Sequence, residues 1–157
     1  MSSSGPGDTD LPFIDEHAVT VDAPADRIWT ALLSVLRRTM GGAGPWARVL
    51  GCDPLEATAV FEGKPGDALP GFRVADSEPG RRLALRGQHR FARYALTFLV
   101  DGNRLRALSH GEFPGARGAL YRGMVIGTGA HRIITRRLLS RVARAVTRAP
   151  PRARAAE

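Results

Sequence analysis

The segment from Leu120 to Val146, LYRGMVIGTGAHRIITRRLLSRVARAV, is the longest stretch of the chain with a single helical pattern. Apolar and small residues recur in it at steps of three or four, which places them on one face of a helix. They are Leu120, Met124, Gly127, His131, Ile134, Leu138 and Val142. The opposite side carries Arg132, Arg136, Arg137, Arg141, Arg144 and Arg148. The pattern predicts a long amphipathic C-terminal helix with a cationic outer face.

The first half of this apolar face is thin. Gly123, Gly127, Gly129 and Ala130 supply little side-chain volume, and His131 stands among them. A helix that only filled a close-packed core would carry larger side chains there. We therefore expect the helix to lie over a hollow or to press closely against a sheet.

Upstream, the pattern changes from strand to helix to strands. Residues 14–22 alternate as a half-buried strand, and residues 24–40 predict a helix that begins at Pro24, has Asp26 in its first turn and ends before Gly41. Turn residues then separate short apolar runs, which indicates an antiparallel meander. The expected strands are 48–52, 57–62, 72–77, 82–89, 93–100 and 104–112.

Composition indicates a globular protein with one domain. The chain has 157 residues, 43% of them hydrophobic and 24% charged. We expect a domain at 13–147 between disordered tails at 1–12 and 148–157. No apolar run reaches the roughly 20 residues of a membrane span, and the N-terminus lacks signal-peptide features, so we expect a cytoplasmic protein without stable membrane insertion. The single Cys52 and four scattered histidines favour neither a disulfide nor a metal site, and we expect no cofactor.

The net charge of +8 comes from the C-terminal part, where residues 115–157 hold 10 arginines against Glu157. Nucleic-acid binding is not expected, because no aromatic residue for base stacking follows Tyr121 on the arginine face. The face is either a solvated helix side or a surface for an acidic protein or an anionic membrane.

The run HAVTVDAPADRIWTALLSVL at residues 17–36 resembles the START-like superfamily, also called the polyketide cyclase and lipid transport or SRPBCC superfamily. The similarity rests on Ala23-Pro24 before the first helix and on Ile28-Trp29 within it. Residues 79–100, 104–115 and 120–127 are also similar to bacterial members, and the resemblance covers roughly 14–146, although residues 41–71 match nothing in it. It implies an α+β helix-grip fold, in which a curved antiparallel sheet wraps around a long C-terminal helix and encloses a cavity.

In such a fold the apolar faces of the strands look inward and line a pocket on the order of 300 to 1,000 Å³. The alternative is that these side chains meet and fill the core. We expect the ligand-binding residues to be His89, Tyr94, Leu96, Phe98, Ser109, Met124, Gly127 and His131.

Two functions are compatible with a lining of this kind. The first is binding or carriage of a small hydrophobic ligand. The second is an enzyme of the polyketide aromatase or cyclase type, with His131 and Tyr94 as candidates for proton transfer. The sequence holds no G-x-S-x-G, H-E-x-x-H or G-x-x-x-x-G-K-[ST] motif, so whether the protein is an enzyme stays open at this point.

Overall fold

The computed structural model describes residues 10–148, so most of both expected tails lies outside the described residues. Its elements follow the predicted order of strand, helix, meander and C-terminal helix. They are β1 (Phe13–Thr20), α1 (Ala25–Gly41), α2 (Gly44–Leu50), β2 (Ala68–Leu69), β3 (Phe72–Glu78), β4 (Arg82–His89), β5 (Ala92–Asp101), β6 (Arg104–Glu112), α3 (Gly115–Arg122), the π-helical turn η1 (Gly123–Gly127) and α4 (Ala130–Arg148).

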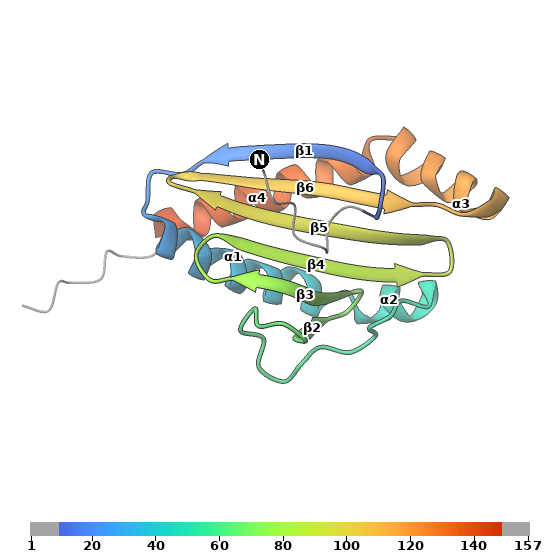
Figure 1. Cartoon of the computed structure of the whole chain (residues 1–157), viewed down its shortest axis with the longest axis horizontal. Helices are drawn as coiled ribbons and strands as arrows, with labels where there is room; N and C mark the ends of the chain where they lie inside the picture. Colours follow the sequence, from blue (N-terminus) through green and yellow to red (C-terminus); the bar gives the residue numbers. More distant parts are fainter. Residues whose placement is uncertain (1–9, 149–157) are drawn as a thin grey trace, which may run out of the picture.

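The strands form one six-stranded sheet in the order β1-β6-β5-β4-β3-β2, and every neighbouring pair is antiparallel. Helices α1 and α4 lie side by side across one face of this sheet, while α2 and α3 lie at one end of it (Figure 1). The meander from β3 to β6 follows the strands expected from the turn residues, and the predicted α+β class is confirmed.

The core lies between the sheet and the two long helices. Ile28, Leu32 and Leu36 of α1 are fully buried, because their spacing of four residues puts them on one face. They meet the inward side chains of the central strands, among which Phe98 and Leu105 are also fully buried. Val142 of α4 completes this layer. Burying an aliphatic side chain of this size contributes about 1.5–3 kcal/mol, so this half of the sheet supplies much of the stability.

The long C-terminal helix is interrupted, which corrects the predicted continuous helix. The chain forms α3, widens into η1 and turns at Gly129, whose φ of +77° suits glycine, before α4 begins. The apolar face also differs from the predicted one, because Leu120, Met124 and Ile134 are 69%, 57% and 63% exposed. The buried face of α4 is instead Thr135, Leu138, Leu139, Val142 and Val146.

Two of the expected strands are wrong. Residues 48–52 fall largely in α2, which has proline in its first turn and ends at Gly51 in the left-handed conformation. That pairing of proline at the start and glycine at the end is a helix signal, but the short apolar run Val49–Leu50 reads equally well as a strand. Residues 57–62 form no strand, although the Thr58 N–H donates to the carbonyl oxygen of Ala68 in β2 over 2.9 Å. Phe61 from this segment is buried in the core at 4% exposure.

Gly87 of β4 is a close-packing position. A Cβ atom there would lie 1.9 Å from the carbonyl oxygen of Gly71 and 2.6 Å from the Tyr94 ring. We predict that Gly87→Ala lowers the free energy of unfolding by about 3 kcal/mol, since backbone must move to accept the methyl group. Gly41→Ala is the control, because a Cβ atom added there would meet no atom within 4 Å beyond its chain neighbours and its own helix backbone, and its effect is expected within about 1 kcal/mol of zero. Urea denaturation measures both, and equal stabilities for the two variants would contradict the close approach.

Candidate functional site: a cavity between the sheet and the helical end

A cavity of about 290 Å³ lies where α2, η1 and the first turn of α4 face the sheet. Its sheet wall is formed by side chains from β3 to β6, including Phe72, Tyr94, Leu96 and Ser109. The helical wall is formed by Trp46, Ala47 and Leu50 of α2, Val125 and Ile126 of η1, and His131 of α4. Most of these side chains are apolar, and the polar groups are few.

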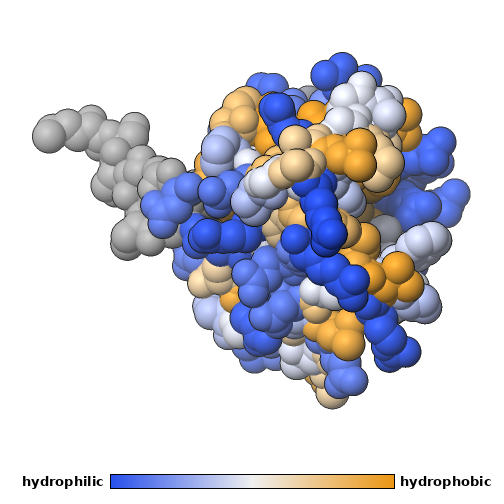
Figure 2. Space-filling model, turned by 90° about the vertical axis from the view of Figure 1, so that its right-hand side faces the viewer, coloured by the Kyte–Doolittle hydropathy of each residue, from blue (hydrophilic) through white to orange (hydrophobic). Residues whose placement is uncertain are grey.

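The hollow exists because α1 and α4 fill only part of the inner face of the sheet. Beyond the end of α1, the short helix α2 and the π-helical turn η1 cover the sheet in place of a leucine-rich helix. At this end of the molecule hydrophobic side chains reach the surface between hydrophilic ones (Figure 2). Trp46 and Val49 of α2 are 73% and 65% exposed, and Leu120 and Met124 are exposed on α3 and η1.

The structure brings five of the eight expected ligand-binding residues to this cavity: His89, Tyr94, Leu96, Ser109 and His131. Phe98 points inward as expected but lies in the filled part of the core under α1, with no exposed surface. Met124 and Gly127 do not line the cavity, because η1 turns their positions toward solvent and presents Val125 and Ile126 inward instead. His131 and Tyr94, the two candidates for proton transfer, line the same cavity.

The α2 wall of the cavity and one carboxylate, that of Asp15, were not predicted from the sequence. Asp15 belongs to the inward face of β1 together with His17 and Val19, and the alternation of that strand was a signal that placed it there. It pairs across the ladder with Ser109 of β6. Its position beside His131 was not predictable, because it depends on how α4 crosses the sheet.

These residues form a polar cluster at the apolar cavity. His131 Nε2 and Ser109 Oγ share a hydrogen bond of 2.9 Å. The same Nε2 lies 3.4 Å from Asp15 Oδ1, and Asp15 Oδ2 accepts a hydrogen bond of 3.1 Å from His17 Nε2. The side chains of Asp15 and His17 are 19% and 11% exposed, so two histidines and a carboxylate share a largely buried site.

The geometry of this cluster differs from a nucleophilic triad. In a triad the carboxylate and the hydroxyl contact opposite nitrogens of the imidazole, whereas here both contact Nε2. Asp15 Oδ1 is buried without a hydrogen bond in the described part of the chain, so a proton on Nε2 of His131 is favoured over a lone pair facing the carboxylate. Nδ1 is then the basic nitrogen of His131. The cluster can accept or relay a proton, but it does not activate Ser109 as a nucleophile.

Tyr94 has a structural partner at the cavity wall. Its hydroxyl donates a hydrogen bond of 2.8 Å to the carbonyl oxygen of Gly71, and its ring packs edge-on against Phe72 at 5.1 Å between centroids. Burial raises the pKa of the Tyr94 phenol well above its ordinary value of 10.0, with a smaller contribution from Cys52. Tyr94 therefore stays protonated, and it can donate a proton only if it releases the Gly71 carbonyl.

His89 belongs to an aromatic group beside the same wall. Its ring packs edge-on against Tyr121 at 4.7 Å and lies 5.5 Å from Tyr94. The Phe91 N–H donates to His89 Nδ1 over 3.1 Å, which leaves the proton of the neutral ring on Nε2. Burial lowers the pKa of His89 from its ordinary value of 6.5, so this lining residue is neutral at pH 7.

This lowered pKa predicts a loss of stability in acid. The unfolded chain takes up a proton on His89 near pH 6.5 whereas the folded chain resists it, so the free energy of unfolding falls as the pH drops below about 6.5 toward the folded pKa. His89→Asn keeps an acceptor for the Phe91 N–H and does not titrate. We expect the stability of the wild type relative to His89→Asn to decrease between about pH 7 and pH 5, measured by urea denaturation. A pH-independent difference would contradict the assignment.

Within residues 10–148, no group of three or more histidine, cysteine, aspartate and glutamate side chains is arranged to hold a metal ion. Among the helices that the structure describes, none combines the length and the apolar character required to cross a bilayer.

Comparison with solved structures identifies the architecture. Protein Mll3558 from Rhizobium loti matches with a TM-score of 0.51 at 17% identity, covering 86% of this chain and 95% of its own. A conserved protein from Geobacillus kaustophilus matches with a TM-score of 0.52 at 13% identity, over 84% and 93% of the two chains. MLL2253 from Mesorhizobium loti also gives 0.52 at 13% identity, over 87% and 98%. The chain has the helix-grip fold.

The resemblance to the START-like superfamily is thus confirmed as a resemblance of fold. No family model matches the sequence, and no curated protein matches it. At identities of 13–17% the helix-grip neighbours show the arrangement of sheet and helices and nothing of a ligand. The function therefore has to be argued from the cavity itself.

Proposed function

We propose that the protein binds a small hydrophobic molecule in the cavity between the sheet and the helical end. The observation that carries this proposal is a space of about 290 Å³ with mostly apolar walls and its polar groups at a few positions. Ligand sites of this kind gain affinity from apolar burial and use their few polar groups for orientation. The volume suits a compact ligand better than a lipid with two long acyl chains.

The aromatic side chains favour a ligand with a flat ring. Phe72, Tyr94, His89 and Tyr121 line the cavity, and their rings contact one another edge-on or tilted. Aromatic rings prefer such edge-to-face and offset contacts, which a ring of the ligand extends. The His131–Ser109 pair and the N–H of neutral His89 supply hydrogen-bonding groups for a carbonyl or hydroxyl of that ligand.

The route of entry is the end where α2 and η1 meet the cavity. Exposed Trp46 belongs to the lining, so the cavity wall continues to the surface there. The helix interruption at η1 and Gly129 separates α3 from α4 at the same place. Small local movements of α2 or η1 admit a ligand without opening the core under α1, and this suits a protein that takes up and releases its cargo.

Filling the cavity tests the binding proposal. Ala47 of α2 lines the cavity and is 4% exposed, whereas Val49 of the same helix is 65% exposed and lies outside the lining. We expect Ala47→Phe to weaken binding of N-phenylnaphthylamine, a neutral fluorescent probe, by about tenfold or more through loss of apolar contact. Val49→Phe is the matched control and leaves the affinity unchanged.

Probe titrations are read together with circular dichroism, so that only folded variants are compared. Equal affinities for wild type and Ala47→Phe would place the probe elsewhere and contradict the proposal. A wild type that does not enhance the fluorescence of the probe would also contradict it.

An enzyme of the aromatase or cyclase type is the second candidate function, and one observation favours it. His131 lines the cavity with its Nε2 beside a largely buried carboxylate, which is an environment suited to removing a proton next to a carbonyl and returning it elsewhere. In such ring-forming chemistry a base removes a proton next to a carbonyl, the resulting enolate carbon attacks a second carbonyl of the same molecule, the alkoxide takes up the proton, and loss of water completes an aromatic ring. None of these steps needs a nucleophilic serine. Under this hypothesis His131 Nδ1 is the base, and Asp15 stabilises the imidazolium that results.

Hydrogen exchange separates an enzyme from a carrier. Tetralone, a fused-ring ketone, exchanges its α-hydrogens for deuterium only when a base removes them, and proton NMR in D₂O follows the loss of signal. An enzyme of this type is expected to accelerate exchange over buffer, and His131→Gln to slow it by about 10²-fold or more. Exchange no faster than in an equal concentration of imidazole would reject the enzymatic role and leave the binding proposal standing.

A further inference from the structure

A second hollow lies on the opposite side of the helical layer from the sheet. It is a groove of about 1180 Å³ between α1 and α4, lined along most of both helices. Arg27 Nη2 donates to the carbonyl oxygen of Val146 over 2.9 Å, and Arg141 Nη1 donates to Thr39 Oγ1 over 3.3 Å, so the two helices run antiparallel along it. This volume exceeds the roughly 1,000 Å³ that small ligands use, which suits a segment of a macromolecule.

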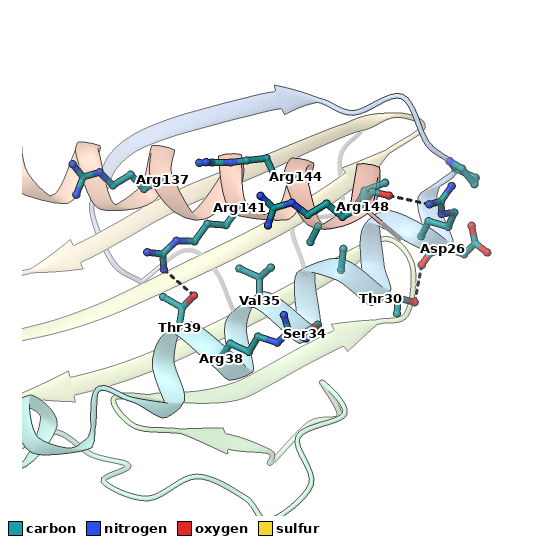
Figure 3. A pocket seen from close by; sticks show the side chains of 15 residues that line it. Asp26, Thr30, Ser34, Val35, Arg38, Thr39, Arg137, Arg141, Arg144 and Arg148 are labelled. Atoms are coloured by element: carbon teal, nitrogen blue, oxygen red, sulfur yellow. Dashed lines mark hydrogen bonds between the residues drawn. The ribbon is translucent and has the colours of Figure 1, made fainter. Parts of the chain in front are cut away.

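The rim of this arginine groove is strongly basic. Arg137, Arg141, Arg144 and Arg148 follow one another along α4, and Arg38 stands on α1 across from them (Figure 3). Among residues 10–148, the lining contains a single carboxylate, that of Asp26. None of these five arginines forms an ion pair with another residue of the described range 10–148. Neighbouring cations without counter-charges repel one another, and an anionic partner relieves that repulsion.

The spacing of the arginines matches that of a helix. The residues on α4 are separated by four, three and four positions, which gives one straight stripe about 16 Å long. A second helix lying in the groove presents its own side chains with the same period. Carboxylates at steps of four, three and four therefore reach successive arginines.

The floor of the groove favours a protein over a membrane or nucleic acid. Val35 and Val146 are recessed at 7% and 3% exposure, with Ala31 and Ala145 beside them. A bilayer surface does not enter such a recess, and the exposed Trp46, Leu120 and Met124 lie outside the groove lining. The part of the lining that the structure describes also has no aromatic side chain on which a base could stack. An amphipathic helix fits, with aliphatic side chains on the floor and carboxylates at the rim.

We propose that the arginine groove binds an acidic α-helix of a partner protein. Thr30, Ser34 and Thr39 on the α1 side add hydroxyl groups for the polar edge of that helix. The surface is separate from the ligand cavity, so the partner docks while the cavity holds its ligand.

The test uses a synthetic helical peptide on the intact protein. The probe is a side-chain-stapled peptide with glutamates at steps of four, three and four residues and leucines on the adjoining face. Fluorescence anisotropy measures its binding at an ionic strength of about 0.15 M. Two peptides are controls: one with glutamine at each glutamate position, and one of the same composition with the glutamates distributed around the helix. Both are expected to bind at least about tenfold more weakly.

Matched protein variants locate the binding surface. The groove variant combines Arg137→Gln, Arg141→Gln and Arg144→Gln, and its control combines Arg122→Gln, Arg132→Gln and Arg136→Gln, which are exposed arginines outside the groove lining. We expect the groove variant to lose about tenfold in peptide affinity and the control less than about twofold. Amide NMR shifts on peptide addition should concentrate in α1 and α4, and binding of N-phenylnaphthylamine should be the same in both variants.

Several results would overturn the proposal. Equal losses of peptide affinity in the two variants would show that binding depends only on the net charge of the protein. If the peptide with redistributed glutamates bound as tightly as the striped peptide, a helical stripe of carboxylates would not be required. Tighter binding of phosphatidylglycerol vesicles or of a DNA duplex, with the same sensitivity to the groove variant, would assign the surface to a membrane or to nucleic acid. Absence of peptide binding to the wild-type protein would also reject it.

Discussion

The packing of α1 and α4 against one face of the sheet is the contact on which the rest of the structure depends. The aliphatic stripe of α1, with Ile28, Leu32 and Leu36, meets the inward side chains of the central strands and the buried face of α4. A sheet needs such a partner because its apolar face cannot remain in water. Both helices share one side, so the sheet is filled where they lie and hollow beyond them. The position of the cavity follows from where α1 ends.

The helix interruption decides which side chains reach that hollow. A continuous α-helix from Leu120 would keep a constant rotation of about 100° per residue and would place Met124 near the face of Leu138. The π-helical turn and the left-handed Gly129 change this phase before α4 begins, so Val125 and Ile126 line the cavity and Met124 is exposed. One irregularity in the backbone thus decides which side chains of η1 reach the hollow, whereas His131 reaches it from α4. The two outer surfaces of the helical layer also differ in character, with exposed apolar side chains at the cavity end and arginines along the groove.

The polar cluster shows how an apolar wall tolerates charge. A buried carboxylate requires hydrogen-bond donors, and Asp15 obtains one from His17 and stands close to a second ring at His131. The three side chains come from β1 and α4, and Ser109 joins them from β6. His17 has a structural role, because it lies in β1 as predicted and donates a hydrogen bond to Asp15. His131 is different, because it also lines the cavity, and a residue with both a buried partner and access to a ligand site can take part in chemistry.

Much of the architecture was accessible from the sequence because it rests on local rules. Alternation predicted β1 and the long strands β3 to β6, turn residues divided them, and capping signals bounded α1. The region 41–71 was misread because short apolar runs have no period that separates a helix such as α2 from a strand. Four expected site residues on strands, His89, Tyr94, Leu96 and Ser109, reached the cavity because strand alternation fixes the face of a side chain, and His131 reached it from the first turn of α4. Phe98 did not reach the cavity. Alternation predicts that its side chain points inward, but it does not predict that a helix packs against the sheet at that position.

The sequence by itself determined the order of elements, the inward faces of the strands and the arginine stripe of the last helix, since each depends on neighbours a few residues apart. Only the tertiary structure decided the place of the cavity, the pairing of Asp15 with His131 and the meeting of α1 and α4 that turns the arginine stripe into a groove. These features join residues roughly a hundred positions apart. Their contacts depend on how helices cross the sheet, and that crossing is set by the summed packing of the whole core rather than by any local pattern.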